Sequence, residues 1–217
     1  MKYIPKYFPL LISLKGKRCL VVGGGRVALR KVRNLLPYST KIFVVSPECV
    51  PKLKEIAKRG KITLFKRPFI DTDLENVDLV FIATNNENLN CVIANKAKSL
   101  NIPVNVVDDP DKCSFIIPSM IRRGPLLITI STDALYPALS KKIRKKLEKD
   151  FGKDFEKYII LIGELRDKII KQIKDKKQKE EIVEFILNSD IFKVIKEMGK
   201  KEAKKLGEKI IKDCLKK

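Results

Sequence analysis

The 217-residue sequence contains no histidine. This absence removes the side chain that most often acts as a general base near neutral pH, and also the commonest metal ligand in proteins. Any acid–base chemistry in this chain would therefore fall to carboxylates, lysines, tyrosines or bound water.

Cysteine is scarce and scattered. No two cysteines form a C-x-x-C pair, and their number is odd: they are Cys19, Cys49, Cys91, Cys113 and Cys214. A disulfide framework or a zinc site is therefore not expected, and we predict no metal site. The pattern is typical of a reducing compartment, so we expect the protein in the cytoplasm.

Long apolar runs are also missing, since none approaches the roughly 18 residues that a membrane-spanning helix needs. The opening MKYIPKYFPLLISLKGK is basic and has a short apolar patch, but Pro5 and Pro9 interrupt it and no small-residue cleavage site follows. We interpret it as part of the fold rather than a signal peptide. Hydrophobic residues make up 44% of the chain and charged residues 34%, which indicates a globular protein with no membrane partner.

Acidic residues are few relative to basic ones, and the formal net charge is +21. Basic proteins often bind nucleic acid through its phosphates. Here the excess is spread along the chain, with +10 of it in residues 141–217. A lysine-rich, thermophile-like surface would have the same composition. We expect no nucleic-acid partner, although such a field would also attract a polyanionic small molecule.

Strand-like and helix-like segments alternate through the first half of the chain. The expected strands are residues 18–22, 41–45, 62–65, 77–83 and 104–107. The expected helices between them are residues 27–36, 51–59 and 89–100. Alternation of this kind predicts an α/β fold with a parallel sheet and right-handed crossovers. The strands are apolar throughout, as parallel strands covered on both faces are.

Beyond about residue 113 the alternation of strands and helices ends. Residues 115–118 and 126–131 read as two strands with no helix between them, separated by the turn-forming Arg122-Arg123-Gly124-Pro125. After Pro137 the pattern is helical to the end, with apolar stripes bordered by lysines. We predict three domains, which are residues 1–113, 114–148 and 149–217.

A glycine-rich turn follows the first expected strand. Gly23, Gly25 and Ala28 have the spacing G-x-G-x-x-A, and the segment opens a helix. In dinucleotide-binding folds the first glycine permits the tight turn, the second lets the backbone approach a pyrophosphate, and the small third residue packs helix on strand. The pattern therefore favours a nucleotide site, the alternative being a turn without a ligand.

The second expected strand ends in Val45-Ser46-Pro47-Glu48, without the acidic residue that usually holds the adenine ribose. Either Ser46 or Glu48 could bond a ribose hydroxyl, or the segment could simply be a turn. No arginine follows directly to receive a 2′-phosphate, so NAD is favoured over NADP.

Two further polar segments follow expected strands at the same sheet edge. Thr84 is a reasonable neighbour of the cofactor, and Asn86 or Asn88 could be no more than a helix N-cap. In the segment NVVDDP, Asp108 or Asp109 could move a proton during hydride transfer, or the pair could form an Asx turn.

With these segments in hand, the chain resembles the precorrin-2 dehydrogenase family, the dehydrogenase and sirohydrochlorin ferrochelatase module of siroheme synthase. The resemblance lies in YFPLLISLKGKRCLVVGGGRVALRKVRNLL, RPF, FIATNNENLN, VNVVDDPDKCSFIIPSMIRRGPLLITIST and YPALSKKIRKKLE, across about residues 3–149. It implies a Rossmann-type sheet, a small β/α dimerisation module and a helical C-terminal domain. It also implies a homodimer that oxidises precorrin-2, a tetrapyrrole, to sirohydrochlorin with NAD.

The resemblance also implies roles for single residues. The dinucleotide phosphates would meet Gly23, Gly24, Gly25, Arg26 and Val27. Its adenosine would lie by Pro47 and Glu48, and its other half by Thr84. The family's key carboxylate falls on Asp108, which is implicated in dehydrogenation and, where present, in insertion of iron.

The chain departs from the family in one loop. The family often reads S-[ST]-G-G-x-S-P after the last strand, whereas residues 131–137 read STDALYP, without either glycine. This loop is expected near the substrate, so contacts there, and metal insertion above all, differ from the family pattern. A rival interpretation is a non-catalytic NAD-sensing module that binds nucleic acid or a transporter through its basic helical tail.

Overall fold

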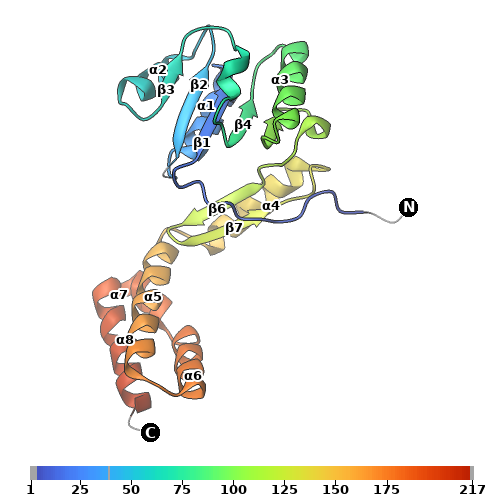
Figure 1. The fold of residues 1–217 in the computed structure, drawn as a ribbon. Coiled ribbons are helices and arrows are strands. Elements are labelled where there is room, and N and C mark those ends of the chain that lie inside the picture. Colours follow the sequence, from blue (N-terminus) through green and yellow to red (C-terminus); the bar gives the residue numbers. More distant parts are fainter. Residues whose placement is uncertain (1–3, 39, 216–217) are drawn as a thin grey trace. The chain divides into compact units, whose positions relative to one another are not determined.

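The structure, a computed structural model, describes residues 4–38 and 40–215. Its contacts divide the chain into two units, residues 1–117 and residues 118–217 (Figure 1). The boundary lies close to the first predicted domain boundary, and the finer division of the second unit into two domains stays a prediction.

The first unit is built on a parallel sheet in the order β3-β2-β1-β4-β5. Its strands are β1 (Arg18–Val22), β2 (Lys41–Val45), β3 (Thr63–Phe65), β4 (Leu79–Ile82) and β5 (Val104–Val106). Every neighbouring pair is parallel. This order, with crossover helices between the strands, confirms the predicted α/β fold with a Rossmann-type sheet.

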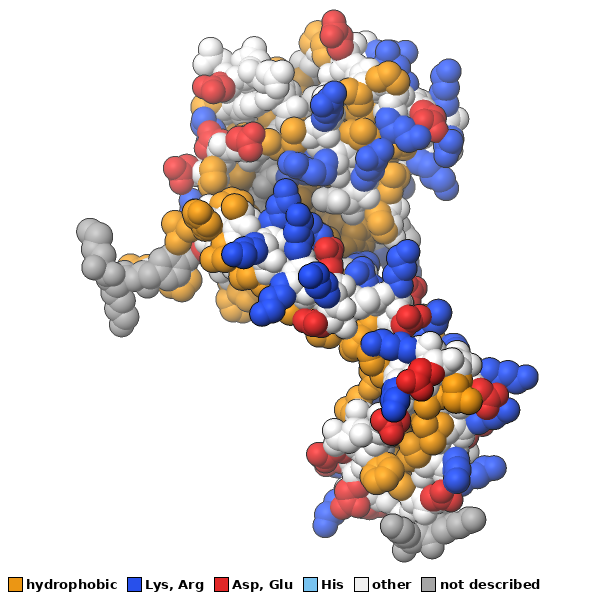
Figure 2. Space-filling view, turned by 180° about the vertical axis from the view of Figure 1, so that it is seen from behind, with side chains coloured by type: hydrophobic (Ala, Val, Ile, Leu, Met, Phe, Trp, Pro, Cys, Tyr) orange, Lys and Arg blue, Asp and Glu red, His pale blue; other side chains and the backbone are white. Residues whose placement is uncertain are grey.

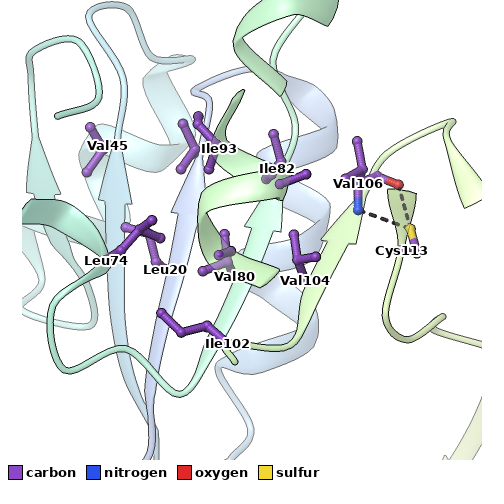
Figure 3. Packing of buried hydrophobic residues seen from close by; sticks show 13 residues of the cluster. Leu20, Val45, Leu74, Val80, Ile82, Ile93, Ile102, Val104, Val106 and Cys113 are labelled. Atoms are coloured by element: carbon purple, nitrogen blue, oxygen red, sulfur yellow. Dashed lines mark hydrogen bonds between the residues drawn. The ribbon is translucent and has the colours of Figure 1, made fainter. Parts of the chain in front are cut away.

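Helices connect the strands of this sheet: α1 (Arg26–Leu35), α2 (Pro51–Lys58) and α3 (Glu87–Ser99), with the short 3-10 turns η1 (Asp71–Leu74) and η2 (Pro110–Lys112). Successive strand residues alternate between two cores. Leu20 and Val80 belong to the core that contains Ile93 of α3 (Figure 3). Cys19 belongs to the core that contains Val32 of α1. Burial on both faces explains why these strands are continuously apolar.

The strands end together at one edge. Val22, the last residue of β1, is in register with Val45 of β2 and with Ile82 of β4. Ile82 is in turn in register with Val106 of β5. The segments that leave these strands therefore gather at the carboxyl edge of the sheet, where ligands of open α/β folds bind.

The second unit begins with an antiparallel pair, β6 (Ser119–Arg123) and β7 (Leu126–Ile130), against which α4 (Pro137–Asp150) packs. The prediction of a strand at residues 115–118 was wrong. Phe115 and Ile117 pack against the core of the first unit instead, and the Phe115 ring meets the Phe81 ring edge-on with centroids 5.5 Å apart. Their apolar character comes from this packing, not from strand pairing.

The remainder of the second unit is helical, as predicted. It contains α5 (Asp154–Gln172), α6 (Lys176–Leu187), α7 (Ile191–Met198) and α8 (Lys200–Leu215). Their apolar faces share one core, in which the rings of Phe155, Tyr158 and Phe192 lie 5.0–5.4 Å apart. Within the described part of the chain, no helix combines the length and apolar character that crossing a membrane requires. Figure 2 shows lysine and arginine side chains distributed over the visible face of both units, as the charge pattern predicted.

Candidate functional site

The glycine turn after β1 is shaped by two close backbone approaches. Gly23 has a φ of +118°, and a Cβ there would lie 2.2 Å from the carbonyl oxygen of Ala83. A Cβ on Gly24 would lie 1.9 Å from the carbonyl oxygen of Glu48. Neither position can accept a side chain without moving the backbone that follows β4 or β2. These two glycines therefore let three strand ends meet.

Gly25 has a different role, because a Cβ there would meet no atom within 4 Å. It is the N-cap of α1 and has no side chain with which to cap the helix. The first backbone N–H groups of the helix, including those of Arg26 and Val27, have no intrahelical partner. An open cradle of N–H groups at the positive end of a helix fits a pyrophosphate.

This cradle forms one side of a pocket of about 560 Å³, within the range of small-molecule sites. The pocket brings together six of the predicted cofactor residues: Gly23, Gly24, Gly25, Pro47, Glu48 and Thr84. Arg26 and Val27 are not among its lining residues; they begin α1 directly after Gly25, and their contact with the phosphates stays a prediction. Asp108 is not among them either.

The turn after β2 uses its serine internally. The side chain of Ser46 is buried, and its hydroxyl donates a hydrogen bond of 2.8 Å to the carbonyl oxygen of Glu48. Ser46 therefore shapes the turn, which is the simpler of the interpretations that the sequence allowed. Glu48 is exposed at the pocket, and its contact with a ribose stays a prediction.

A loop to which the sequence analysis assigned no role forms another wall of the pocket. Pro68 and Phe69 line it, and Arg67 holds their loop through two hydrogen bonds to Asp73, of 2.8 and 2.6 Å. Burial acts to raise the pKa of the Asp73 carboxyl. The bonds from Arg67 and from the Ile70 N–H outweigh it and hold that pKa below the usual range. The RPF triplet was a signal for this loop, but its acidic partner six residues later was not recognised.

Thr84 is fixed by the start of α3. Its hydroxyl lies 2.5 Å from Oδ1 of the buried Asn90, whose Nδ2 donates to the Thr84 carbonyl oxygen at 3.1 Å. Asn86 is the N-cap of α3, because its Oδ1 accepts a hydrogen bond of 2.9 Å from the Leu89 N–H. Thr84 thus lines the pocket in a turn that Asn86 and Asn90 of the α3 N-terminus hold in place.

The two adjacent aspartates after β5 have different surroundings. Asp109 is the N-cap of η2, and its carboxylate accepts hydrogen bonds from the Lys112 N–H at 3.3 Å and from Lys112 Nζ at 2.5 Å. The bond from the Lys112 side chain lowers the pKa of the Asp109 carboxyl. Asp108 is exposed and has a φ of +61°, a left-handed conformation that aspartate tolerates. Of the two carboxylates, Asp108 is the one directed to solvent.

Two more polar residues, which are bonded to each other, were missed in the sequence analysis. Lys31 of α1 donates a hydrogen bond of 2.7 Å to Oδ1 of Asn105, which is buried in β5. The signal in the sequence was a single asparagine inside an otherwise apolar strand and a lysine beside the apolar stripe of Ala28 and Val32. Within the described residues, no three His, Cys, Asp or Glu side chains gather in a group that could hold a metal ion.

Comparison with known proteins identifies this architecture. Residues 10–119 match the family described as "Putative NAD(P)-binding". The siroheme synthase of Vesicomyosocius okutanii is 37% identical over 190 residues, which is 86% of this chain and 41% of that protein. The siroheme synthase of Pseudoalteromonas atlantica is 42% identical over 139 residues, covering 64% of this chain and 30% of that protein. The chain thus spans less than half the length of these curated relatives.

A solved structure matches over most of this chain and the whole of its own length. The structure titled "SirC, precorrin-2 dehydrogenase" superposes with a TM-score of 0.78 and 26% identity. The match covers 94% of this chain and 100% of that one. It therefore includes the helices of the second unit as well as the sheet of the first.

Proposed function

Since this chain belongs to the putative NAD(P)-binding family, we propose that it oxidises precorrin-2 to sirohydrochlorin on the route to siroheme. The observation that carries the proposal is the pairing of two features at one sheet edge. One is the open helix N-terminus at Gly25, and the other is the solvent-directed carboxylate of Asp108. The likeness to the structure of a precorrin-2 dehydrogenase, over 94% of this chain, gives these features a substrate.

The cofactor is NAD, which when bound supplies the hydride acceptor. The N–H groups at the start of α1 would hold its phosphates, with Gly23 and Gly24 keeping the turn narrow enough to reach them. Glu48 and Pro47 would lie along its adenosine, and Thr84 by its other half. No arginine follows β2 directly, which favours NAD over NADP.

Asp108 would provide the proton chemistry. Dehydrogenation removes a hydride and a proton from the tetrapyrrole and leaves a new carbon–carbon double bond in conjugation. The carboxylate of Asp108 would accept the proton, directly or through a water molecule that it holds. Its neighbour cannot substitute, because Asp109 is engaged by Lys112 through both its backbone and its side chain.

The charge of the chain suits this substrate, because precorrin-2 is a tetrapyrrole that carries many carboxylates. A net charge of +21 would raise its local concentration and its rate of encounter. We infer that the basic surface serves this small anion and not nucleic acid. Added duplex DNA should therefore leave turnover at physiological salt unchanged, and strong inhibition by DNA would contradict the inference.

We also propose that the protein is a homodimer formed through the start of the second unit. A two-stranded sheet with one helix is marginal by itself, and of the residues of β6 and β7 only Ile121 is buried. Large apolar side chains are exposed in and before α4: Leu135 (72%), Leu139 (42%) and Ile143 (37%). Light scattering after gel filtration should give twice the chain mass, and Ile143→Lys should give the monomer.

The five cysteines are all free thiols, which supports a location in the cytoplasm. Insertion of iron into sirohydrochlorin, which the sequence left open, stays a prediction. An assay with sirohydrochlorin and Co²⁺ or Fe²⁺ tests it, and a rate equal to the spontaneous background would reject it.

The experiment that tests the proposed function is anaerobic incubation of the protein with precorrin-2 and NAD. Formation of sirohydrochlorin, followed by its absorption spectrum, is expected only when protein and NAD are both present. The rival NAD-sensing module predicts that NAD binds but no product forms. That outcome would contradict the proposal.

A further inference from the structure

The side chain of Lys31 points into the first unit instead of toward water. It lies on α1, is only partly exposed, and donates to Asn105 Oδ1 at 2.7 Å. Its ammonium lies 5.9 Å from the centre of the Phe81 ring. A lysine in this position gives up part of its hydration, so an amide oxygen and a ring face must replace it.

Asn105, which accepts the hydrogen bond from Lys31, also contacts the segment after η2. Its Nδ2 donates a hydrogen bond of 3.0 Å to the carbonyl oxygen of Phe115 and lies 3.6 Å from the sulfur of Cys113. The side chain is 5% exposed. One buried amide therefore joins α1, β5 and the chain at residues 113–115.

Cys113 then closes the base of the loop that carries Asp108. Its sulfur accepts a hydrogen bond of 3.1 Å from the Val106 N–H and lies 3.2 Å from the Val106 carbonyl oxygen (Figure 3). It also lies 3.2 Å from the carbonyl oxygen of Asp109. These contacts hold the two ends of the loop formed by residues 107–112 close together. The left-handed Asp108 lies inside this loop.

The charges around Lys31 form one small set. Burial lowers the pKa of the Lys31 ammonium, and the neighbouring charge of Arg30 lowers it further. Cys113 and Asp108 act in the opposite direction. The carboxylate of Asp108 is therefore one of the charges that act on the Lys31 ammonium.

We propose that Lys31 and Asn105 are positioning residues, which hold the loop after β5 so that the carboxylate of Asp108 faces the substrate. This inference rests on the proposed function. Neither residue lines the nucleotide pocket. Loss of the hydrogen bonds made by Lys31 and Asn105 should therefore impair the chemical step and leave cofactor binding intact.

The test compares Lys31→Met with Arg33→Met, an exposed cationic position on the same helix. For Lys31→Met we expect kcat to fall about 10- to 100-fold, the order of loss that misplacement of a reacting group causes. The Kd for NAD should stay within about twofold. Arg33→Met should match the wild type, and Lys31→Arg should recover most of the rate because a guanidinium can still donate to Asn105. Wild-type kcat in Lys31→Met would overturn the proposal.

Two further readouts separate positioning from a general loss of structure. The wild-type rate should decline at alkaline pH as Lys31 loses its proton, and Lys31→Arg should move that decline to higher pH. Hydrogen exchange needs no turnover: the Val107 N–H, which donates to the Ile82 carbonyl at 3.0 Å, should exchange faster in Lys31→Met but not in Arg33→Met. If no variant turns over precorrin-2, the proposed function fails. Hydrogen exchange alone then tests whether Lys31 and Asn105 hold the loop in place. Unchanged exchange in residues 106–112 would contradict it.

Discussion

Thr84 and Asp108 leave neighbouring strands at the same level. Ile82 of β4 pairs with Val106 of β5, and each of the two residues follows two positions later. The alignment extends past the last pair, because the Val107 N–H donates to the Ile82 carbonyl. A residue of the nucleotide pocket and the candidate proton acceptor are therefore set by adjacent strands of one sheet.

The glycine turn allows binding to be separated from folding at a single position. Gly25→Asp should abolish NAD binding, because its carboxylate would project toward the phosphate site. The fold should keep or slightly gain stability, since aspartate is a better N-cap than glycine by a few tenths of a kcal/mol. Isothermal titration with NAD and thermal unfolding measure the two effects. Undiminished NAD affinity would place the phosphates elsewhere.

The adjacent glycine should behave in the opposite manner. In Gly24→Ala the added methyl group would lie 1.9 Å from the Glu48 carbonyl oxygen, so the backbone must move. We expect a loss of about 1–3 kcal/mol in the free energy of unfolding, as for other overpacked sites. Urea unfolding followed by circular dichroism checks this. An unfolding free energy equal to that of the wild type would show that the turn has room for a methyl group at residue 24.

The Arg67–Asp73 pair should make the stability depend on pH. The folded-state pKa of Asp73 is lowered, so its contribution is complete above its unfolded pKa of about 3.9 and is lost as the pH falls through the folded value. Asp73→Asn should be less stable than the wild type at neutral pH, and the difference should disappear in acid. Asp111→Asn is the matched control, because Asp111 pairs with Lys6 while 96% exposed, and such a solvent-exposed pair contributes little to stability. A pH-independent difference would rule out the ion pair as its cause.

The loop that departs from the family pattern has kept a glycine-like backbone. Asp133 and Ala134, which replace the two glycines, have φ values of +55° and +65°. Aspartate tolerates this region, but an alanine there costs roughly 1 kcal/mol. Ala134→Gly should therefore stabilise the protein, by up to about 0.5 kcal/mol after the greater unfolded-state entropy of glycine is subtracted.

Ala138→Gly provides the control for that substitution, because Ala138 lies in α4 and has no positive φ. There the change should destabilise the protein, by up to about 1 kcal/mol. Thermal unfolding of both variants should give shifts of opposite sign. Destabilisation by both would mean that the loop does not store strain at Ala134.

The sequence predicted β1 and β2 to the residue, because each is a short apolar run bounded by turn-forming residues. It misplaced β6, since Phe115 and Ile117 are apolar for a reason that local pattern does not contain, namely packing on the core of the first unit. The contact between Lys31 and Asn105 joins residues 74 positions apart. Such pairs depend on the packing of α1 on the sheet, which periodicity predicts only in outline.

The most direct measurement of the central claim is anaerobic turnover of precorrin-2 by the wild type and by Asp108→Asn. Asparagine also tolerates the left-handed backbone, so the variant keeps the loop and loses only the carboxylate. The wild type should form NADH and sirohydrochlorin in equal amounts. Asp108→Asn should bind NAD normally and turn over about 10²- to 10⁴-fold more slowly. Wild-type turnover by Asp108→Asn, or NAD binding without product in the wild type, would contradict the account.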